Sequence, residues 1–192
     1  MNICVYGASS SELDPVYRKA VYELGKEMGL RGHTLVFGAG DTGMMGAAAH
    51  GITDAGGRTI GIAPRFFDEP GVLFPSCSEM IFTETMRERK LILEVMSDGF
   101  IVAPGGVGTM DEFFEMWTLR MLGRTRKPIA MLNVNGYYDE LLTFLKKAMK
   151  ERFFQKDVLQ LLFVSDDIKA VLDYVTTQSS GQETHITQEE KQ

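Results

Sequence analysis

Residues 100–112 read FIVAPGGVGTMDE, which is a short apolar run followed by a glycine-rich turn and the start of a helical segment. The run Phe100–Ala103 has the length and composition of a buried strand. Three of the four residues at 105–108 are glycine, so the backbone can bend tightly before the helix begins. A buried strand that leads through a turn into a helix is typical of the βαβ unit, from which parallel sheets are built.

The same alternation runs through most of the chain. Short β-rich runs are separated by longer segments of helical period, such as residues 16–28, where an apolar residue recurs at every fourth position. Asp14 followed by Pro15 marks the start of that helix, because an acidic cap and a proline in the first position favour helix initiation. The expected strands are Ile3–Tyr6, Thr34–Phe37, Thr59–Ala63, Met80–Thr83, Phe100–Ala103, Ile129–Leu132 and Leu162–Val164.

This pattern predicts an α/β fold, a Rossmann-like doubly wound parallel sheet of about seven strands with helices on both faces. In such a sheet, ligands bind beyond the carboxyl ends of the strands, near the point where the strand order reverses. Residues 1–175 are expected to form a single nucleotide-binding domain. Residues 176–192 lose the apolar periodicity and are expected to form a polar, flexible C-terminal tail.

Composition argues against several classes of protein. The 192 residues carry a net charge of −6, which disfavours a surface that binds nucleic acid. No run reaches the roughly 18 apolar residues that a membrane span requires. Two cysteines do not make a disulfide framework, and the three histidines lack metal-ligand spacing. We therefore expect a cytoplasmic protein with no metal and with no nucleic acid or membrane partner.

Residues 38–46 read GAGDTGMMG and contain the G-x-G-x-x-G spacing of dinucleotide-binding loops. The strand that follows ends at Ala63-Pro64, without the acidic residue that would hold a ribose hydroxyl. The motif also follows the second strand and not the first, so nicotinamide chemistry is disfavoured. Tight packing between strand and helix accounts for Gly43 and Gly46 without any ligand.

The turn at residues 105–109 is the stronger candidate for a binding site. Its glycines let backbone N–H groups approach an anion closely, and the following helix adds the partial positive charge of its N-terminus. Thr109 offers a hydroxyl to the same anion. The alternative is a plain turn with a threonine cap and with an acid, Asp111, in the first helical turn. That alternative leaves three glycines unexplained, so the pattern favours a phosphate site.

A basic cluster, TMRERK at residues 85–90, begins the helix after the fourth strand. Basic residues at a helix start oppose the helix dipole, and a solvated face is the simplest interpretation of such a run. The cluster nevertheless follows the carboxyl end of a strand, in the same layer as residues 104–112. Arg89 and Glu112 are therefore expected to converge over a bound phosphate.

Residues 86–90 read Met-x-x-Arg-Lys, and residues 104–112 read Pro-Gly-Gly-x-Gly-Thr-x-x-Glu. This pair of motifs resembles the signature of the LONELY GUY (LOG) family of cytokinin riboside 5′-monophosphate phosphoribohydrolases, and the resemblance extends from the first strand to about residue 175. It implies a hydrolase that cleaves the N-glycosidic bond of a nucleoside 5′-monophosphate. The substrate would be AMP or a cytokinin riboside 5′-monophosphate, and the products would be the free base and ribose 5-phosphate.

The resemblance also implies roles for individual residues. Arg89 and Glu112 would be the catalytic pair, with no metal or organic cofactor, and the protein would be a homodimer. Glu112 would stabilise the positive charge that develops on the ribose, and Arg89 would hold the ribose-phosphate part of the substrate. The residues implied to bind the substrate are Lys90, Gly105, Gly106, Val107, Gly108, Thr109 and Thr118.

Two other functions fit parts of the pattern. A non-catalytic carrier of a nucleotide-like ligand or of molybdenum cofactor would need the glycines, but not Arg89 together with Glu112. A pyridoxal-phosphate decarboxylase would need a Schiff-base lysine with a partner for the pyridinium, and Lys90 has no such context. The hydrolase is the favoured interpretation, and the carrier is the alternative.

Two apolar segments each allow two interpretations. Residues 64–79 are rich in phenylalanine and proline, and they either cover a base or cap the core. Residues 113–122 are apolar nearly all round as a helix, so they form either an enclosed core helix or, as we predict, a dimer interface. In the dimer, Thr118 would complete the site of the partner.

Overall fold

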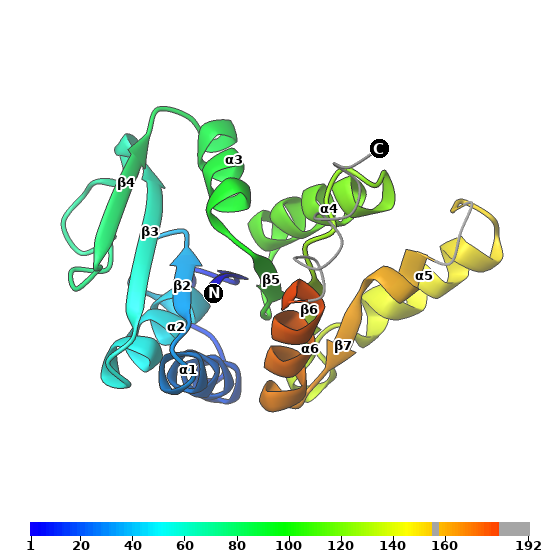
Figure 1. Cartoon of the computed structure of the whole chain (residues 1–192), viewed down its shortest axis with the longest axis horizontal. Helices are drawn as coiled ribbons and strands as arrows, with labels where there is room; N and C mark the ends of the chain where they lie inside the picture. Colours follow the sequence, from blue (N-terminus) through cyan, green and yellow to red (C-terminus); the bar gives the residue numbers. More distant parts are fainter. Residues whose placement is uncertain (155–157, 181–192) are drawn as a thin grey trace, which may run out of the picture.

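The computed structural model describes residues 1–154 and 158–180, and within them it contains one sheet of seven parallel strands (Figure 1). The strand order is β4-β3-β2-β1-β5-β6-β7. Each strand end lies within one residue of the prediction from sequence, which confirms the predicted fold class. The strands are β1 (Asn2–Tyr6), β2 (Thr34–Phe37), β3 (Arg58–Pro64), β4 (Glu79–Thr83), β5 (Gly99–Val102), β6 (Ile129–Leu132) and β7 (Phe163–Ser165).

Six α-helices flank this sheet within the described residues. The first begins where predicted, because the Asp14 carboxylate accepts from the N–H of Val16 at 2.9 Å and Pro15 takes the first position. The helices are α1 (Pro15–Leu30), α2 (Gly43–Asp54), α3 (Met86–Met96), α4 (Val107–Met121), α5 (Asp139–Lys150) and α6 (Ile168–Ser180). Short 3₁₀ turns are η1 (Arg65–Phe67), η2 (Val134–Gly136) and η3 (Val158–Leu161).

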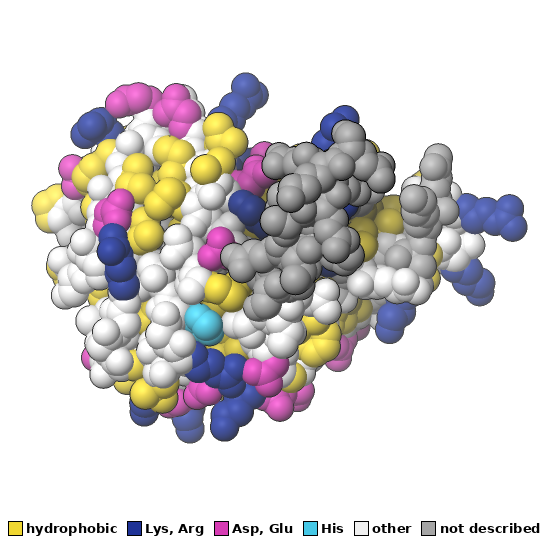
Figure 2. Space-filling view, viewed as in Figure 1, with side chains coloured by type: hydrophobic (Ala, Val, Ile, Leu, Met, Phe, Trp, Pro, Cys, Tyr) yellow, Lys and Arg dark blue, Asp and Glu magenta, His cyan; other side chains and the backbone are white. Residues whose placement is uncertain are grey.

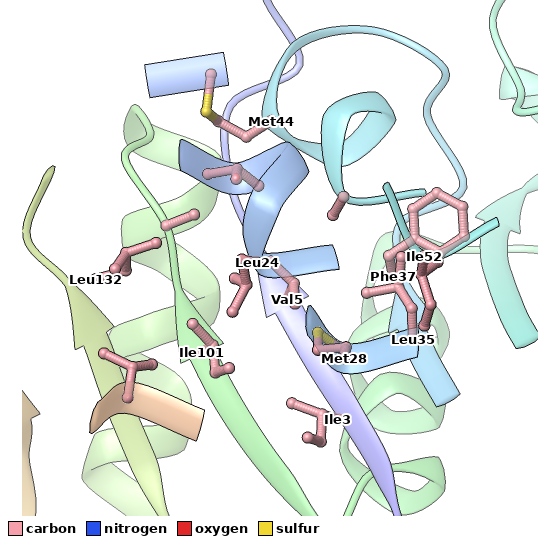
Figure 3. Close-up of a cluster of buried hydrophobic side chains, with 14 of the residues drawn as sticks. Ile3, Val5, Leu24, Met28, Leu35, Phe37, Met44, Ile52, Ile101 and Leu132 are labelled. Carbon is pink, nitrogen blue, oxygen red and sulfur yellow. The ribbon is translucent and has the colours of Figure 1, made fainter. Parts of the chain in front are cut away.

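Alternate side chains of each strand pack on opposite faces of the sheet. Ile3 and Val5 of β1 pack in one core with side chains of α1, α2 and α6, whereas Cys4 and Tyr6 pack in the other with side chains of α3, α4 and α5. Figure 3 shows part of the first of these two cores, where Leu24 of α1 lies over Val5. The sheet is therefore doubly wound, as predicted.

The strand order reverses between β1 and β5. β1 pairs with β2 on one side and with β5 on the other, so the crossovers run outward from this point in opposite directions. The loops after β1 and β5 diverge there and leave a crevice at the carboxyl edge of the sheet. At the base of the crevice the two loops touch, because the N–H of Ala8 donates to the carbonyl of Pro104 at 3.1 Å.

The C-terminal boundary differs from the prediction. α6 continues to Ser180, so residues 176–180 are helical and do not begin a frayed tail. The hydroxyl of Thr177 donates to the carbonyl of Asp173, four residues earlier, at 2.6 Å. Such bonds within a helix satisfy a polar side chain that the hydrophobic pattern does not account for. The rest of the predicted tail, residues 181–192, lies outside the described residues.

The surface carries both signs of charge. On the face shown in Figure 2, Lys and Arg side chains lie interspersed with Asp and Glu and form no basic stripe. Throughout residues 1–154 and 158–180, no helix combines the length and the apolar character needed to cross a bilayer. The same residues contain no group of three or more His, Cys, Asp or Glu side chains placed to hold a metal ion.

Candidate active site

A cavity of about 810 Å³ lies at the carboxyl edge of the sheet, where the strand order reverses. Its lining includes the loops after β1, β2 and β5, together with Tyr17 of α1, Arg89 of α3 and Glu112 of α4. This is the location that the sheet topology predicts for a ligand. The volume falls within the range of small-molecule sites.

Arg89 and Glu112 form a buried ion pair in the wall of this cavity. Nη1 of Arg89 donates to Oε1 of Glu112 at 2.9 Å, and Nε of Arg89 donates to the carbonyl of Ile62 at 3.1 Å. The exposed fractions of the two residues are 7% and 9%. Gly38 provides the space for the guanidinium, because a Cβ there would overlap Nη2. The expectation that the two side chains converge is confirmed.

The buried environment of Glu112 favours the protonated form of its carboxyl group, compared with the same group exposed to water. Burial raises the pKa of this carboxyl group above its ordinary value of 4.5, and the charge and hydrogen bond of Arg89 oppose the rise only in part. Because the carboxyl group is largely buried, its ionised form acts strongly on any positive charge that develops nearby.

The glycine-rich loop from 104 to 109 forms another part of the cavity, and each of its residues contributes to the lining. Gly106, Val107 and Gly108 are exposed, whereas Gly105 and Thr109 are buried. Gly105 packs directly against the side chain of Thr109, and a Cβ at Gly105 would overlap that side chain. The start of α4, at Val107 and Gly108, therefore borders the cavity, and the free amides of a helix start favour an anion.

Two residues that sequence associated with the substrate do not line the cavity. Nζ of Lys90 pairs with Asp111 at 3.0 Å and with Glu115 at 2.8 Å, and it thereby joins α3 to α4. Thr118 is exposed on the outer side of α4. Within one chain, the structure does not bring either residue to the site.

Residues that follow strands other than β5 also line the cavity, and they were not predicted from the sequence. Tyr137, which comes after β6, lines the cavity, and its hydroxyl donates to the carbonyl of Gly105 at 2.9 Å. Ser9 and Thr42 also line the cavity, from the loops after β1 and β2. The available signal was their position after a strand, because every such loop in a parallel sheet opens on the same edge.

Residues 64–79 were expected either to cover a base or to cap the core, and different residues of this segment pack in the core and line the cavity. Phe74 is buried, and its ring contacts those of Phe37 and His50, so this part caps the core. Phe67 and Val72 line the cavity instead. The connection between β3 and β4 therefore seals the core at one point and forms an apolar wall of the site at another.

In the G-x-G-x-x-G segment, residues 38–46, some glycines allow close backbone packing and others line the cavity. Gly43 has φ +62°, and a Cβ there would overlap the carbonyl of Ala8. Gly46 lies equally close to the backbone of Asp41. The packing interpretation of Gly43 and Gly46 is confirmed, whereas Gly38 and Gly40 of the same segment line the cavity.

Known proteins match this chain over most of its length. The family model described as "Possible lysine decarboxylase" matches residues 45–175. A cytokinin riboside 5′-monophosphate phosphoribohydrolase of Arabidopsis thaliana is 34% identical over 185 residues, which cover 96% of this chain and 86% of the relative. A protein of Oryza sativa subsp. japonica with the name of a probable enzyme of this kind is 35% identical over 170 residues, covering 88% and 81% of the two chains. The chain belongs to the LOG family.

Solved structures show the same fold as this LOG-family chain. The molybdenum cofactor carrier protein of Chlamydomonas reinhardtii superposes with a TM-score of 0.69 at 22% identity, over 93% of this chain and 98% of the other. The molybdenum cofactor binding protein of Rippkaea orientalis gives a TM-score of 0.67 at 22% identity, over 92% and 94% of the two chains. At this identity the likeness is one of fold.

Proposed function

We propose that the chain hydrolyses the N-glycosidic bond of a nucleoside 5′-monophosphate, AMP or a cytokinin riboside 5′-monophosphate, to the free base and ribose 5-phosphate. The observation that carries the proposal is the buried Arg89–Glu112 pair, which lines one cavity together with a glycine-rich helix start. The names of the LOG-family relatives support the same reaction.

The phosphate group belongs at the glycine-rich loop. The amides of Gly106, Val107 and Gly108 lie at the start of α4, where the helix dipole favours an anion. Thr109 adds a hydroxyl within the cavity lining. Binding energy gained at the phosphate then holds the sugar in place, and this lowers the entropic cost of reaching the transition state.

The reaction takes place at the anomeric carbon, opposite Glu112. As the C1′–N bond breaks, positive charge develops on the ribose ring, and the fixed carboxylate stabilises that charge. The oxygen of a water molecule bonds to C1′, and Glu112 takes one proton from this water. The electron pair of the broken bond stays on the base, which leaves after it gains a proton at its ring nitrogen. The balance needs substrate and water alone.

Arg89 acts on both the carboxylate and the substrate. Its bond to Glu112 and its bond to the carbonyl of Ile62 fix the orientation of the carboxylate. Its remaining nitrogen, Nη2, lies beside Gly38 in the cavity lining, where it offers charge to the ribose-phosphate part of the substrate. Contact between Lys90 and the substrate stays a prediction, since Lys90 is engaged with Asp111 and Glu115.

The base belongs at the apolar wall. Met45, Phe67, Val72 and Met86 line the cavity with hydrocarbon, sulfur and an aromatic ring. Such a wall favours a flat base or an apolar substituent on it, because burial of that surface removes it from water.

We also propose a homodimer formed through the outer side of α3 and α4. Val95 and Leu122 are each 67% exposed, and Phe114 is partly exposed one turn before Thr118. Exposed apolar side chains on adjacent helices are a common mark of a protein interface. In this arrangement Thr118 lies within the interface, where it is available to the site of the partner.

The remaining expectations are a cytoplasmic location and a small-molecule partner. The thiols of Cys4 and Cys77 are both free, which supports a reducing compartment. The interspersed surface charges in Figure 2 support a small-molecule substrate over a nucleic acid.

The test is to incubate the purified chain separately with AMP, with a prenylated adenosine 5′-monophosphate and with adenosine. Chromatography and mass spectrometry detect the free base and ribose 5-phosphate. We expect base to be released from the monophosphates and not from adenosine, which lacks the group that the loop binds. Release from no 5′-monophosphate would reject the hydrolase and leave the carrier of a nucleotide-like ligand or molybdenum cofactor.

A further inference from the structure

Two consecutive tyrosines hold the glycine-rich loop from the side of β6. The hydroxyl of Tyr138 donates to the carbonyl of Ala103 at 2.7 Å, and that of Tyr137 donates to the carbonyl of Gly105 at 2.9 Å. The partners are 35 and 32 residues apart in sequence. The loop is therefore fixed by groups that belong neither to it nor to the helix that it begins.

The turn before α5 directs both rings toward β5. Asn135 and Gly136 have φ values of 52° and 68°, a left-handed conformation that bends the chain back sharply. The side-chain oxygen of Asn133 accepts from the N–H of Tyr138 at 2.7 Å, which fixes the backbone at that point. The rings of Tyr137 and Tyr138 then meet edge to face, with their centroids 4.8 Å apart.

The neighbouring carbonyls of the loop are occupied as well. The carbonyl of Pro104 accepts from the N–H of Ala8 at 3.1 Å, and that of Gly106 accepts from the N–H of Met110 at 3.0 Å. Four consecutive carbonyls, from residue 103 to residue 106, thus each accept a hydrogen bond from a donor of the protein itself. A carbonyl oxygen turned toward the cavity would repel a phosphate, whereas the amides at the start of α4 attract one.

We propose that Tyr137 and Tyr138 are positioning residues that orient the loop so that its amides, and not its carbonyls, meet the phosphate. The inference deepens the proposed function and rests on it, because it takes the loop as the phosphate site. Tyr138 is buried and acts through Ala103, whereas Tyr137 also lines the cavity. The affinity for the phosphate part of a ligand then depends on two hydroxyls, while the affinity for the base does not.

Tyrosine-to-phenylalanine substitutions test this proposal, because each removes one oxygen and keeps the ring. Calorimetry on the full chain measures binding of two separate probes, ribose 5-phosphate and adenine. We expect Tyr138→Phe and Tyr137→Phe each to lower the affinity for ribose 5-phosphate by about tenfold. Loss of one hydrogen bond has an effect of this size at the upper end of the usual energy range. Adenine binding should not change. Tyr22→Phe is the matched control, because it deletes a hydroxyl bonded to Asp54 at 2.7 Å, away from the loop, and should alter neither affinity.

Each outcome decides the proposal. Selective loss of ribose 5-phosphate binding supports it. An equal loss of both probes would mean general loosening and would overturn it. Unchanged ribose 5-phosphate affinity in both variants overturns the inference and leaves the proposed function in place, whereas a wild-type chain that does not bind ribose 5-phosphate rejects both. If circular dichroism shows that Tyr138→Phe is unfolded, Tyr137→Phe decides alone, since that residue is partly exposed.

Discussion

Glu112 combines burial with a charged partner, and this combination sets its chemistry. A buried carboxylate whose partner is removed carries a penalty of several kcal/mol, so such pairs persist where the charge has a use. In this chain both Arg89 and Glu112 line the cavity, so their charges are placed to act on a bound ligand.

The substitution Glu112→Gln separates charge from shape. Glutamine still accepts a hydrogen bond from Arg89 but carries no negative charge, so we expect kcat for base release from AMP to fall by about 10²- to 10⁴-fold. Calorimetry should find ribose 5-phosphate binding intact, because the phosphate binds elsewhere in the cavity. Glu140→Gln, at an exposed position in the first turn of α5, is the control and should keep full activity. A parallel loss of binding and turnover in Glu112→Gln would contradict the assigned role.

The pH dependence of the reaction should reflect the buried position of Glu112. The carboxylate works in its ionised form, so activity falls as the pH falls through its pKa. Burial raises that pKa above the ordinary value of 4.5, and the acid limb of kcat/KM should therefore have its midpoint above this pH. A profile of initial rates for AMP checks this expectation. An acid midpoint at or below the ordinary value would show that Glu112 is not the titrating group.

Some residues of the site could be predicted from the sequence and others could not. Arg89 and Glu112 were accessible because each lies in a motif with a fixed spacing. Tyr137 has no such motif and reaches the cavity only because η2 bends the chain back toward β5. Lys90 follows Arg89 directly, yet a helix turns by about 100° per residue, so neighbours in sequence point to different sides.

At the scale of single elements, the start of α4 shows how two glycines of one loop differ in function. Gly105 fits against the side chain of Thr109, with no space for a Cβ, whereas a Cβ at Gly108 would meet no atom within 4 Å. The glycine at 105 is required by packing, and the glycine at 108 leaves the helix start open.

Alanine at these two positions should therefore have opposite effects on stability. Gly105→Ala should lower the free energy of unfolding by about 1–3 kcal/mol, the usual cost of overpacking. Gly108→Ala lies within α4 and should leave this free energy unchanged or raise it by up to about 1 kcal/mol. Urea unfolding followed by circular dichroism compares the two variants with wild type. Destabilisation of the same size in both would contradict the packing described for Gly105.

One predicted boundary differs from the structure. α6 extends to Ser180 through residues that lack the apolar pattern, and there the Thr177 hydroxyl donates to the carbonyl of Asp173 within the helix. The helix over residues 113–122 was predicted to form a dimer interface because it is apolar nearly all round, and the interface stays a prediction. In the structure Phe113, Met116 and Trp117 pack into the core of the same chain, and Phe114 and Leu122 stay on the outside.

At the scale of the whole molecule, the order of strands and helices was readable from the sequence. Parallel strands buried on both faces give short continuous apolar runs, and the crossover rule leaves few ways to connect them. Which strands lie next to each other, and hence where the crevice opens, depends on the winding at β1, and no local pattern records it.

For the whole molecule, the prediction concerns the oligomeric state, which we expect to be a homodimer. Light scattering coupled to size exclusion should give twice the 21.4 kDa mass of one chain. The double substitution Val95→Asp with Leu122→Asp places charge on the exposed side of α3 and α4, and it should shift the protein to the mass of one chain. Phe144→Asp, at an exposed phenylalanine of α5, is the control and should leave the mass unchanged. A wild-type mass of one chain would rule out the dimer.

Two residues of the apolar wall, Phe67 and Val72, belong to one connection, the one between β3 and β4. The carboxylate of Glu112 and the glycine-rich loop stand on other elements, α4 and the end of β5. This part of the proposed base site is thus separate in sequence from the residues proposed to break the bond. Substitutions at Phe67 and Val72 are therefore expected to alter the nucleobase preference while the Arg89–Glu112 pair stays in place.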